Sequence, residues 1–189
     1  MHPDPIASPP SPQPRRVFVL GATGTIGRAT VRALVRRGHE VVCLVRPEAR
    51  DAGRRLPGAD VRIGEATDPA SLARDGLRGE RFDALVSCLA SRTGAPKDAW
   101  AIDHQAHVHA LEAAQRAGVS QMVLLSAICV QKPVLAFQHA KLAFEKRLIE
   151  SGVAYSIVRP TAYFKSLSGQ VERVKLGKPF LVFGDGTLT

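Results

Sequence analysis

Cysteines and long hydrophobic runs are both scarce in this chain of 189 residues. Its cysteines, Cys43, Cys88 and Cys129, are odd in number and far apart, which argues against a disulfide framework and against a Cys-x-x-Cys metal site. Free thiols of this kind are typical of a reducing compartment, so we predict a cytoplasmic location. No apolar run is long enough to span a bilayer. We therefore predict no integral membrane segment and leave peripheral association with a membrane open.

Acidic residues are outnumbered in the chain, with 17 Asp and Glu against 26 Lys and Arg, which gives a net charge of +9. A chain this basic can bind nucleic acid. Here, however, the arginines are scattered, and several fall on the polar face of an amphipathic helix. We therefore predict no nucleic-acid partner. The basic surface also suits anionic small ligands such as phosphates and carboxylates.

The order of apolar segments predicts an α/β domain. Residues 1–14 are rich in proline and serine and form a predicted disordered lead-in without the apolar core of a secretion signal. Beyond them, strands and helices alternate, which predicts a parallel, doubly wound Rossmann-type sheet over residues 15–160. Residues 161–189 are predicted to begin a substrate-binding region. The predicted strands are 16–20, 40–45, one within 59–68, 82–91, 121–127 and 154–160, and the predicted helices are 28–38, one from Pro69 capped by Asp68, 97–119 and 134–152.

The segment "VFVLGATGTIGRATVRALVRRG" joins the first predicted strand to the first predicted helix through a glycine-rich loop. In a dinucleotide-binding turn, such glycines allow a tight turn, close approach to a pyrophosphate, and close packing of helix on strand. The helix N-terminus then offers free N–H groups to the phosphates. The spacing GxxGxxG is the form found in short-chain dehydrogenase/reductase-type domains. The predicted coenzyme contacts here are Gly21, Thr23, Gly24, Thr25, Ile26 and Gly27.

The second predicted strand ends in "CLVRPEAR", where an NAD site usually carries an acidic residue for the ribose 2′-OH. This chain has Arg46 there, and Arg50 one helical turn further on. An arginine fork can hold a 2′-phosphate, so NADPH is favoured over NADH, with two solvent-facing arginines as the alternative. Glu65 and Ala66 are predicted to contact the adenine. After the fourth strand, the loop predicted to pass the riboses contains Cys88, Leu89 and Ala90.

Ser126 ends the fifth predicted strand, and Lys141 follows on the next helix. Short-chain reductases place a serine and a Tyr-x-x-x-Lys pair in this arrangement, in which the lysine holds the nicotinamide ribose and the tyrosine protonates a carbonyl oxygen. Phe137 stands where that tyrosine would be. We predict that Ser126 and Lys141 bind the coenzyme, with Lys141 as the catalytic lysine, and that Phe137 packs near the ring. A surface ion pair with Glu145 is the alternative for Lys141.

Four segments make the chain recognisable: "SCLASRTGAPKDAWAIDHQA", "VLLSAICVQKPVLAFQHAKLAFE", "YSIVRPTAYFKSLSGQVERVKLGKPF" and "FGDGTLT". Together they resemble the 3,8-divinyl chlorophyllide a 8-vinyl reductases, NADPH-dependent atypical short-chain reductases of chlorophyll and bacteriochlorophyll synthesis. The resemblance covers nearly everything from Arg16 to Thr189. Members of that family continue well past the "FGDG" segment, so the resemblance predicts that this chain is truncated at its C-terminus.

The resemblance implies reduction of the C8 vinyl group of a chlorophyllide or protochlorophyllide to an ethyl group. Reduction of a C=C bond forms no oxyanion, so it does not need a phenol. Pro160 and Ala162 are then predicted to border the nicotinamide, and Phe137, Tyr163, Phe164 and Lys165 to meet the tetrapyrrole. A buried Phe164 with a solvated Lys165 is the alternative. Water, Tyr163, Lys165 and a residue beyond Thr189 all stay open as the proton donor.

His104 and His107 are spaced as a metal-ligand pair, but no other cluster completes a site, so we predict no metal and regard them as surface or helix-packing residues. Trp100 is predicted to lie in the core. A non-catalytic NADP-binding sensor or assembly protein of the atypical short-chain reductase group is the alternative function. The sequence leaves the oligomeric state undetermined.

Overall fold

A computed structural model describes residues 13–161 and 168–180 of the chain. The chain divides into two compact units, Met1–Arg159 and Pro160–Thr189, which are described separately below. Most of the predicted lead-in lies outside the described residues, as do Ala162, Tyr163, Phe164, Lys165 and the "FGDG" segment.

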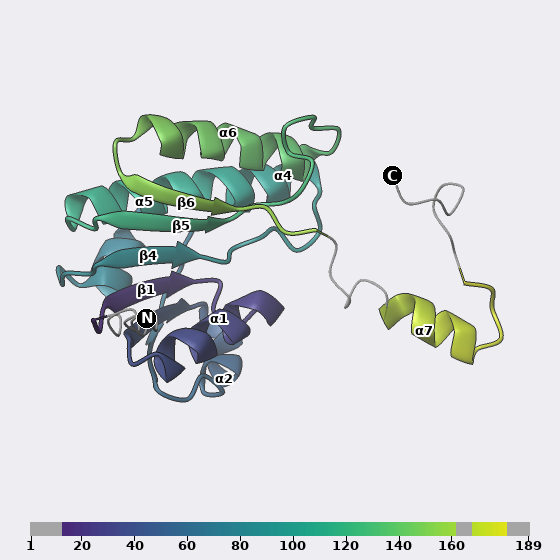
Figure 1. Ribbon diagram of the computed structural model, residues 1–189, viewed down its shortest axis with the longest axis horizontal. Helices are drawn as coiled ribbons and strands as arrows, with labels where there is room; N and C mark the ends of the chain where they lie inside the picture. Colours follow the sequence, from purple (N-terminus) through teal and green to yellow (C-terminus); the bar gives the residue numbers. More distant parts are fainter. Residues whose placement is uncertain (1–12, 162–167, 181–189) are drawn as a thin grey trace, which may run out of the picture. The chain divides into compact units, whose positions relative to one another are not determined.

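The first unit is built on one six-stranded sheet in the order β3-β2-β1-β4-β5-β6 (Figure 1). All five strand pairs are parallel, and Leu20 of β1 lies opposite both Leu44 of β2 and Ser87 of β4. This order confirms the predicted doubly wound Rossmann-type sheet. The strands are β1 (Arg16–Leu20), β2 (Glu40–Val45), β3 (Ala59–Ile63), β4 (Ala84–Ser87), β5 (Gln121–Leu125) and β6 (Ala154–Val158).

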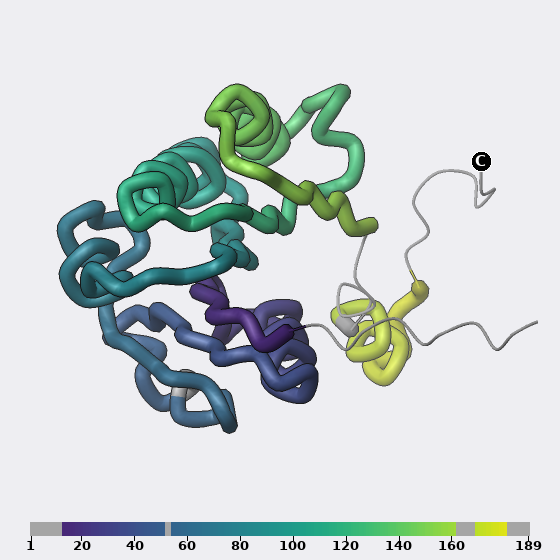
Figure 2. The backbone as a smooth tube through the Cα atoms, turned by 60° about the vertical axis from the view of Figure 1, so that its left-hand side comes forward, coloured from purple at the N-terminus to yellow at the C-terminus, as the bar shows by residue number. Residues whose placement is uncertain are grey.

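Helical segments connect the strands, as parallel pairing requires. Figures 1 and 2 show α5 and α6 beside each other and α1 apart from them. The segments of this unit are α1 (Thr25–Arg36), η1 (Pro47–Ala49), α2 (Arg50–Gly53), α3 (Pro69–Ser71), η2 (Leu72–Leu77), α4 (Pro96–Ala99), η3 (Trp100–Ala106), α5 (His107–Arg116) and α6 (Ala136–Glu150). The predicted cap of the 69–77 segment is confirmed, because the Asp68 carboxylate accepts a hydrogen bond from the backbone N–H of Ala70.

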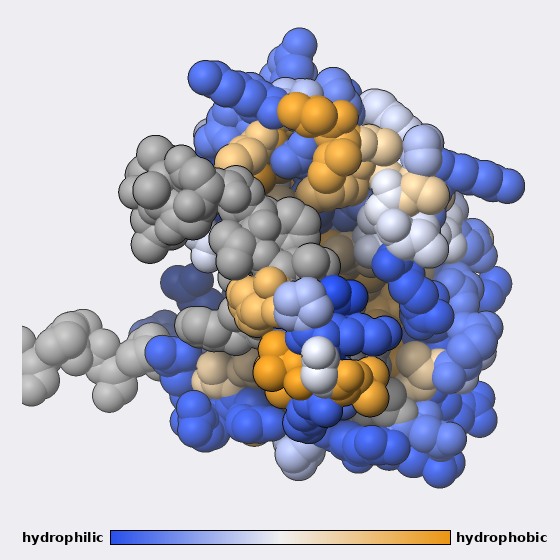
Figure 3. All heavy atoms as spheres, turned by 90° about the vertical axis from the view of Figure 1, so that its right-hand side faces the viewer, coloured by the Kyte–Doolittle hydropathy of each residue, from blue (hydrophilic) through white to orange (hydrophobic). Residues whose placement is uncertain are grey.

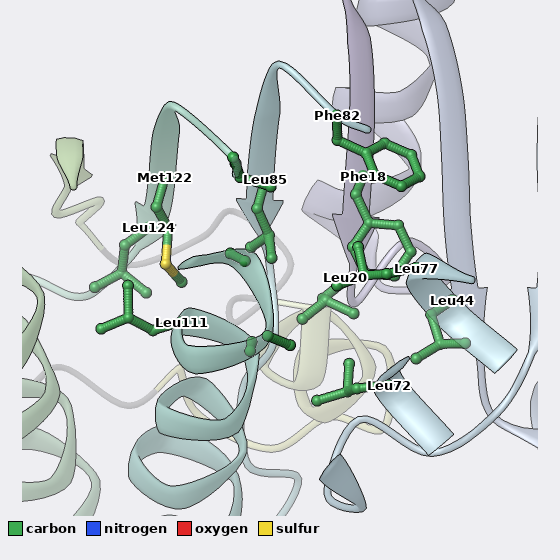
Figure 4. Packing of buried hydrophobic residues seen from close by; sticks show 14 of the residues in the cluster. Phe18, Leu20, Leu44, Leu72, Leu77, Phe82, Leu85, Leu111, Met122 and Leu124 are labelled. Atoms are coloured by element: carbon green, nitrogen blue, oxygen red, sulfur yellow. The ribbon is translucent and has the colours of Figure 1, made fainter. Parts of the chain in front are cut away.

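Alternate residues of each strand bury against opposite layers of helices. On one face, Phe18, Leu20, Leu85, Met122 and Leu124 pack with residues of η2, α5 and α6 (Figure 4). On the other face, Val17, Val19 and Cys43 pack with Val31 of α1. The two clusters hold the carboxyl ends of the strands in register, and those ends position the loops that form the site.

The structure corrects two details of the prediction. The region predicted as one helix at 97–119 contains a π-helical stretch, η3, whose wider turns re-aim its side chains. Trp100, predicted in the core, is 45% exposed. It stands at the start of η3 and lines an apolar groove of about 700 Å³ together with Leu142 and Ala143 of α6.

The second unit contains the helix α7 (Ser168–Lys175). Val171 and Val174 of this helix are about half exposed. Within the described ranges, no helix of either unit combines the length and the apolar character needed to cross a bilayer.

Candidate coenzyme site

The glycine loop between β1 and α1 is packed so closely that two of its glycines have no room for a side chain. Gly21 has a positive φ of 72°, and a Cβ there would lie 2.5 Å from the backbone carbonyl carbon of Cys88. A Cβ on Gly27 would lie 2.1 Å from the carbonyl oxygen of Gly21. Gly24 differs, because its closest neighbour would be 3.4 Å away. The loop is therefore pressed against the end of β4 and the start of α1, and Gly24 keeps an open backbone.

This loop lies at the point where the strand order reverses, between β1 and β4. Ligands of open parallel sheets bind in the crevice at such a point. The backbone N–H of Cys88 donates to the carbonyl of Leu20, which fixes the end of β4 beside the glycine loop. Leu89 is partly buried against the core, and Ala90 is exposed. The N-terminus of α1 and the Cys88–Ala90 loop therefore lie together at the topological switch point of the sheet, where such sheets bind their ligands.

The carboxyl ends of β2 and β3 form the next part of this edge. Val45 pairs with Ile63, so Arg46 and Glu65 follow at neighbouring strand ends. Burial raises the pKa of the Glu65 carboxyl, Glu48 raises it further, and the positive charge of Arg46 opposes them. Arg46 and Arg50 are exposed, and neither forms an ion pair within the described part of the chain. Two guanidinium groups without an ion-pair partner among the described residues therefore follow β2, at Arg46 and at the start of α2.

The loop after β3, which carries Glu65 and Ala66, is held by a serine of α3 and by the hydrophobic core. The hydroxyl oxygen of Ser71 accepts from the backbone N–H of Glu65 at 2.9 Å and donates to Asp75 at 2.7 Å. Ala66 packs against the hydrophobic core. The segment predicted to contact the adenine is therefore fixed by its hydrogen bond to Ser71 and by the packing of Ala66 on the core.

Lys141 is not the surface residue of an i,i+4 pair. It is 5% exposed, and its Nζ lies 3.0 Å from a carboxylate oxygen of Asp103, which is 1% exposed. The same Nζ donates to the carbonyl oxygen of Leu125 at 3.4 Å. Glu145, the alternative partner, instead pairs with Arg159 at 2.5 Å. The lysine is therefore held at the end of β5 by a buried carboxylate.

A second buried polar pair lies beside the first. His107 Nδ1 lies 2.9 Å from the carbonyl oxygen of Ile102 and must donate to it, so its Nε2 accepts from the Ser87 hydroxyl at 2.8 Å. Burial, with the nearby charge of Lys141, lowers the pKa of His107 to about 3. The imidazole is therefore neutral and fixes Ser87, whose hydroxyl oxygen also accepts from the backbone N–H of Leu89 at 3.4 Å.

The loop between β5 and α6 brings Ser126 and Phe137 to the same edge. Ser126 is buried, and Phe137 is partly buried with a ring carbon near Gly94. The loop also exposes apolar side chains, with Ile128 47%, Val134 83% and Leu135 54% exposed. Figure 3 faces the edge where the strands end and shows hydrophobic surface near its top, where this loop lies. Gln138 orders the loop by accepting from the backbone N–H groups of Val134 and Leu135.

Sequence reasoning missed three features of this edge. Asp103 was not identified, because its position within a long helix resembles that of any solvated acid. His107 was predicted only as a surface or helix-packing residue, and its hydrogen bond to Ser87 was not foreseen. No group of three or more His, Cys, Asp or Glu residues that could hold a metal ion is present in the described ranges. The exposed apolar loop was also overlooked. Pro160, predicted beside the nicotinamide, falls in the second unit, and Ala162 lies outside the described residues.

The geometry agrees with a comparison against protein families. Residues 21–186 match the model of a family described as NAD(P)H-binding. The chain belongs to this NAD(P)H-binding family. Its glycine loop, strand order and crevice are therefore parts of a nicotinamide-dinucleotide-binding domain.

Several curated proteins are similar to this chain in sequence. The chain is 48% identical, over 191 residues, to the chloroplastic divinyl chlorophyllide a 8-vinyl-reductase of Oryza sativa subsp. indica, covering 94% of this chain and 47% of the relative. Relatives of the same name from Zea mays, Cucumis sativus and Arabidopsis thaliana are 46%, 47% and 46% identical. The photosystem II assembly factor Ycf39 of Synechocystis is 30% identical over 156 residues, covering 82% of this chain and 47% of that protein. The chain thus spans about half the length of the curated relatives it matches.

The same comparison corrects the predicted location. The four reductases above are named as chloroplastic proteins. The cytoplasmic prediction is therefore wrong. It relied on thiols that are free in the structure, and free thiols report a reducing environment without saying which compartment provides it.

Solved structures support the fold. The Bordetella bronchiseptica enzyme WbmG, in complex with NAD, superposes with a TM-score of 0.74 at 20% identity, covering 89% of this chain and 62% of that one. A UDP-galactose 4-epimerase gives a TM-score of 0.71 at 23% identity, covering 85% of this chain and 63% of that one. Both are similar to this NAD(P)H-binding chain in fold alone.

Proposed function

We propose that this chain provides the coenzyme site of an NADPH-dependent reductase that converts the C8 vinyl group of a divinyl chlorophyllide or protochlorophyllide to ethyl, in chlorophyll or bacteriochlorophyll synthesis. One observation supports it above all others. Four curated reductases of that name are 46–48% identical to this chain, with 94–96% of the chain covered. The location of the crevice and the buried lysine agree with the proposal.

The residues of the site suit this reaction. NADPH supplies a hydride when bound. The glycine loop and the N-terminus of α1 are proposed to hold its pyrophosphate, and Lys141 and Ser126 to bind near its nicotinamide ribose. Addition of hydride to a vinyl group places negative charge in the conjugated macrocycle and not on a carbonyl oxygen. A phenolic donor at position 137 therefore has no oxyanion to stabilise, and Phe137 instead offers a flat apolar surface.

The tetrapyrrole is proposed to lie against the β5–α6 loop. Ile128, Val134 and Leu135 of that loop expose apolar surface at the edge where the crevice opens. A flat macrocycle buries apolar area there and excludes water from the nicotinamide. Tyr163, Phe164 and Lys165, which lie outside the described residues, remain proposed contacts from the following segment, with Lys165 proposed to meet a propionate.

Coenzyme choice is proposed to depend on Arg46. We expect Arg46→Ala to weaken NADPH binding about 10- to 100-fold, because a charge-assisted fork to the 2′-phosphate is lost. NADH affinity should change less than about threefold. Coenzyme titrations by protein fluorescence measure both values, with Arg55→Ala as the control, since Arg55 is also exposed but lies before the amino end of β3, away from the end of β2 that carries Arg46. An equal loss for NADPH and NADH would remove the 2′-phosphate assignment.

The proposed activity is tested by mixing the purified protein with NADPH and divinyl chlorophyllide and recording the Soret band. Loss of vinyl conjugation is expected to shift that band to shorter wavelength, and NADPH binding is measured separately by fluorescence. NADPH binding without a band shift would favour the second candidate, a non-catalytic assembly protein. The similarity to Ycf39 supports that candidate, but at a lower identity of 30%. Absence of NADPH binding would remove both.

A further inference from the structure

Asp103, the ion-pair partner of Lys141, and Ser126, at the end of β5, each have a buried polar atom without a hydrogen-bond partner among the described residues: the second carboxylate oxygen Oδ2 and the hydroxyl. Buried polar atoms are nearly always paired, so such atoms call for a reason. Asp103 contacts Lys141 through Oδ1 at 3.0 Å, and Ser126 follows Leu125, whose carbonyl accepts from Lys141.

The position of Asp103 is set by the π-helical stretch η3 (Trp100–Ala106). Its Oδ1 also accepts from the backbone N–H of Ser91 at 3.3 Å, which ties η3 to the loop after β4. His107, at the end of the stretch, is anchored to Ser87 at the end of β4. The carboxylate is therefore held from the β4 side and the ammonium from the β5 side, so the ion pair bridges the two strand ends.

The ammonium of Lys141 has three N–H donors, and the described residues accept from two of them, through Asp103 and Leu125. The third donor is available to a ligand. Of its neighbours, His107 is neutral, and Glu145, on the same helix as Lys141, forms its own ion pair with Arg159. Asp103 is thus the counter-charge that allows a buried ammonium to persist at this depth.

We propose that Asp103 is a positioning residue that fixes the place and the charge of Lys141, so that the lysine binds the coenzyme ribose in a site that has no tyrosine. This inference rests on the proposed function. In a carbonyl reductase the positive charge of the lysine acts on a neighbouring phenol. Phe137 offers no phenol on which that charge could act, and the carboxylate of Asp103 is the group that balances it.

A double-mutant cycle on NADPH affinity tests the proposal. We expect Asp103→Asn to weaken NADPH binding about tenfold and Lys141→Met about 100-fold. Because Asp103 acts through Lys141, the double variant should bind no more weakly than Lys141→Met alone. An independent structural role would instead give multiplied losses, about 1,000-fold, and would overturn the proposal. Unchanged affinity in Asp103→Asn would overturn it as well.

Two further variants keep the test decisive. Glu112→Gln, a partly buried carboxylate on the neighbouring α5, should leave NADPH affinity unchanged. Asp103→Glu keeps the charge and should retain most of the affinity. If the asparagine variant does not fold, Asp103→Leu, which also removes the carboxylate, replaces it in the cycle. If wild-type protein binds no NADPH, the proposed function fails. If wild type binds and the cycle is additive, only the role of Asp103 fails.

Discussion

Replacement of Gly27 by alanine is expected to abolish measurable coenzyme binding and to destabilise the fold. The added Cβ would lie 2.1 Å from the carbonyl oxygen of Gly21 and 2.9 Å from the Cα of Ala22. These are backbone atoms, so the glycine loop or helix α1 must move as a whole. We expect NADPH affinity to fall by at least about 100-fold and the free energy of unfolding to fall by about 1–3 kcal/mol. Fluorescence titration and urea denaturation measure the two effects.

Two other glycines serve as matched controls. A Cβ at Gly24 would make only one ordinary contact, at 3.4 Å, so Gly24→Ala should fold normally and lose affinity only if a pyrophosphate lies over that residue. Gly169→Ala, in α7, meets nothing within 4 Å and should change neither quantity. Wild-type NADPH affinity in Gly27→Ala would mean that close packing of α1 on β1 is not needed for coenzyme binding.

Replacement of Lys141 by methionine is expected to remove both stability and affinity. The change leaves the carboxylate of Asp103, which is 1% exposed, without its counter-charge. Removing one partner of a buried ion pair typically costs about 3–5 kcal/mol of folding free energy. Loss of the ammonium also removes the proposed ribose contact. Urea denaturation and NADPH titration, compared at one pH, measure the two losses.

Lys146→Met is the control for this change, because Lys146 lies on the same helix, is 76% exposed at its side chain, and is 3.9 Å from its partner Glu150. An exposed pair of that kind contributes less than about 1 kcal/mol. The double variant Asp103→Leu with Lys141→Met removes both buried charges and should regain much of the stability but none of the affinity. Recovery of affinity in that variant would show that the lysine does not bind the coenzyme.

The fold could be predicted well from the sequence because its signals are local. Strands β1 and β2 have the predicted bounds, because each consists of an apolar run and the charged residue before it. The β4 prediction, 82–91, was too long, because β4 ends at Ser87 and the apolar Leu89 lies in the following loop. Helix α1 begins at Thr25, three residues earlier than predicted, because Gly27 serves helix packing from within the helix. Periodicity alone does not distinguish such a glycine from a loop glycine.

The coenzyme site could be predicted in part. The positions of the glycine loop, Arg46 and the Cys88–Ala90 loop follow from the order of the strands, since the carboxyl ends of parallel strands meet at one edge. Their coenzyme contacts stay predictions. The partner of Lys141 could not be predicted, because Asp103 lies 38 positions earlier and reaches the lysine only through the turns of η3. The exposure of Trp100 has the same origin, since a π-helical stretch changes which side chains face the core.

An isotope label tests hydride transfer from the coenzyme to the vinyl group. The protein is incubated with divinyl chlorophyllide and NADPH that carries deuterium at nicotinamide C4 on the transferred face, and the product is analysed by mass spectrometry. We expect an 8-ethyl product that carries one deuterium in the ethyl group. Unlabelled ethyl product, or recovery of the divinyl substrate from a sample in which the protein binds NADPH, would contradict it.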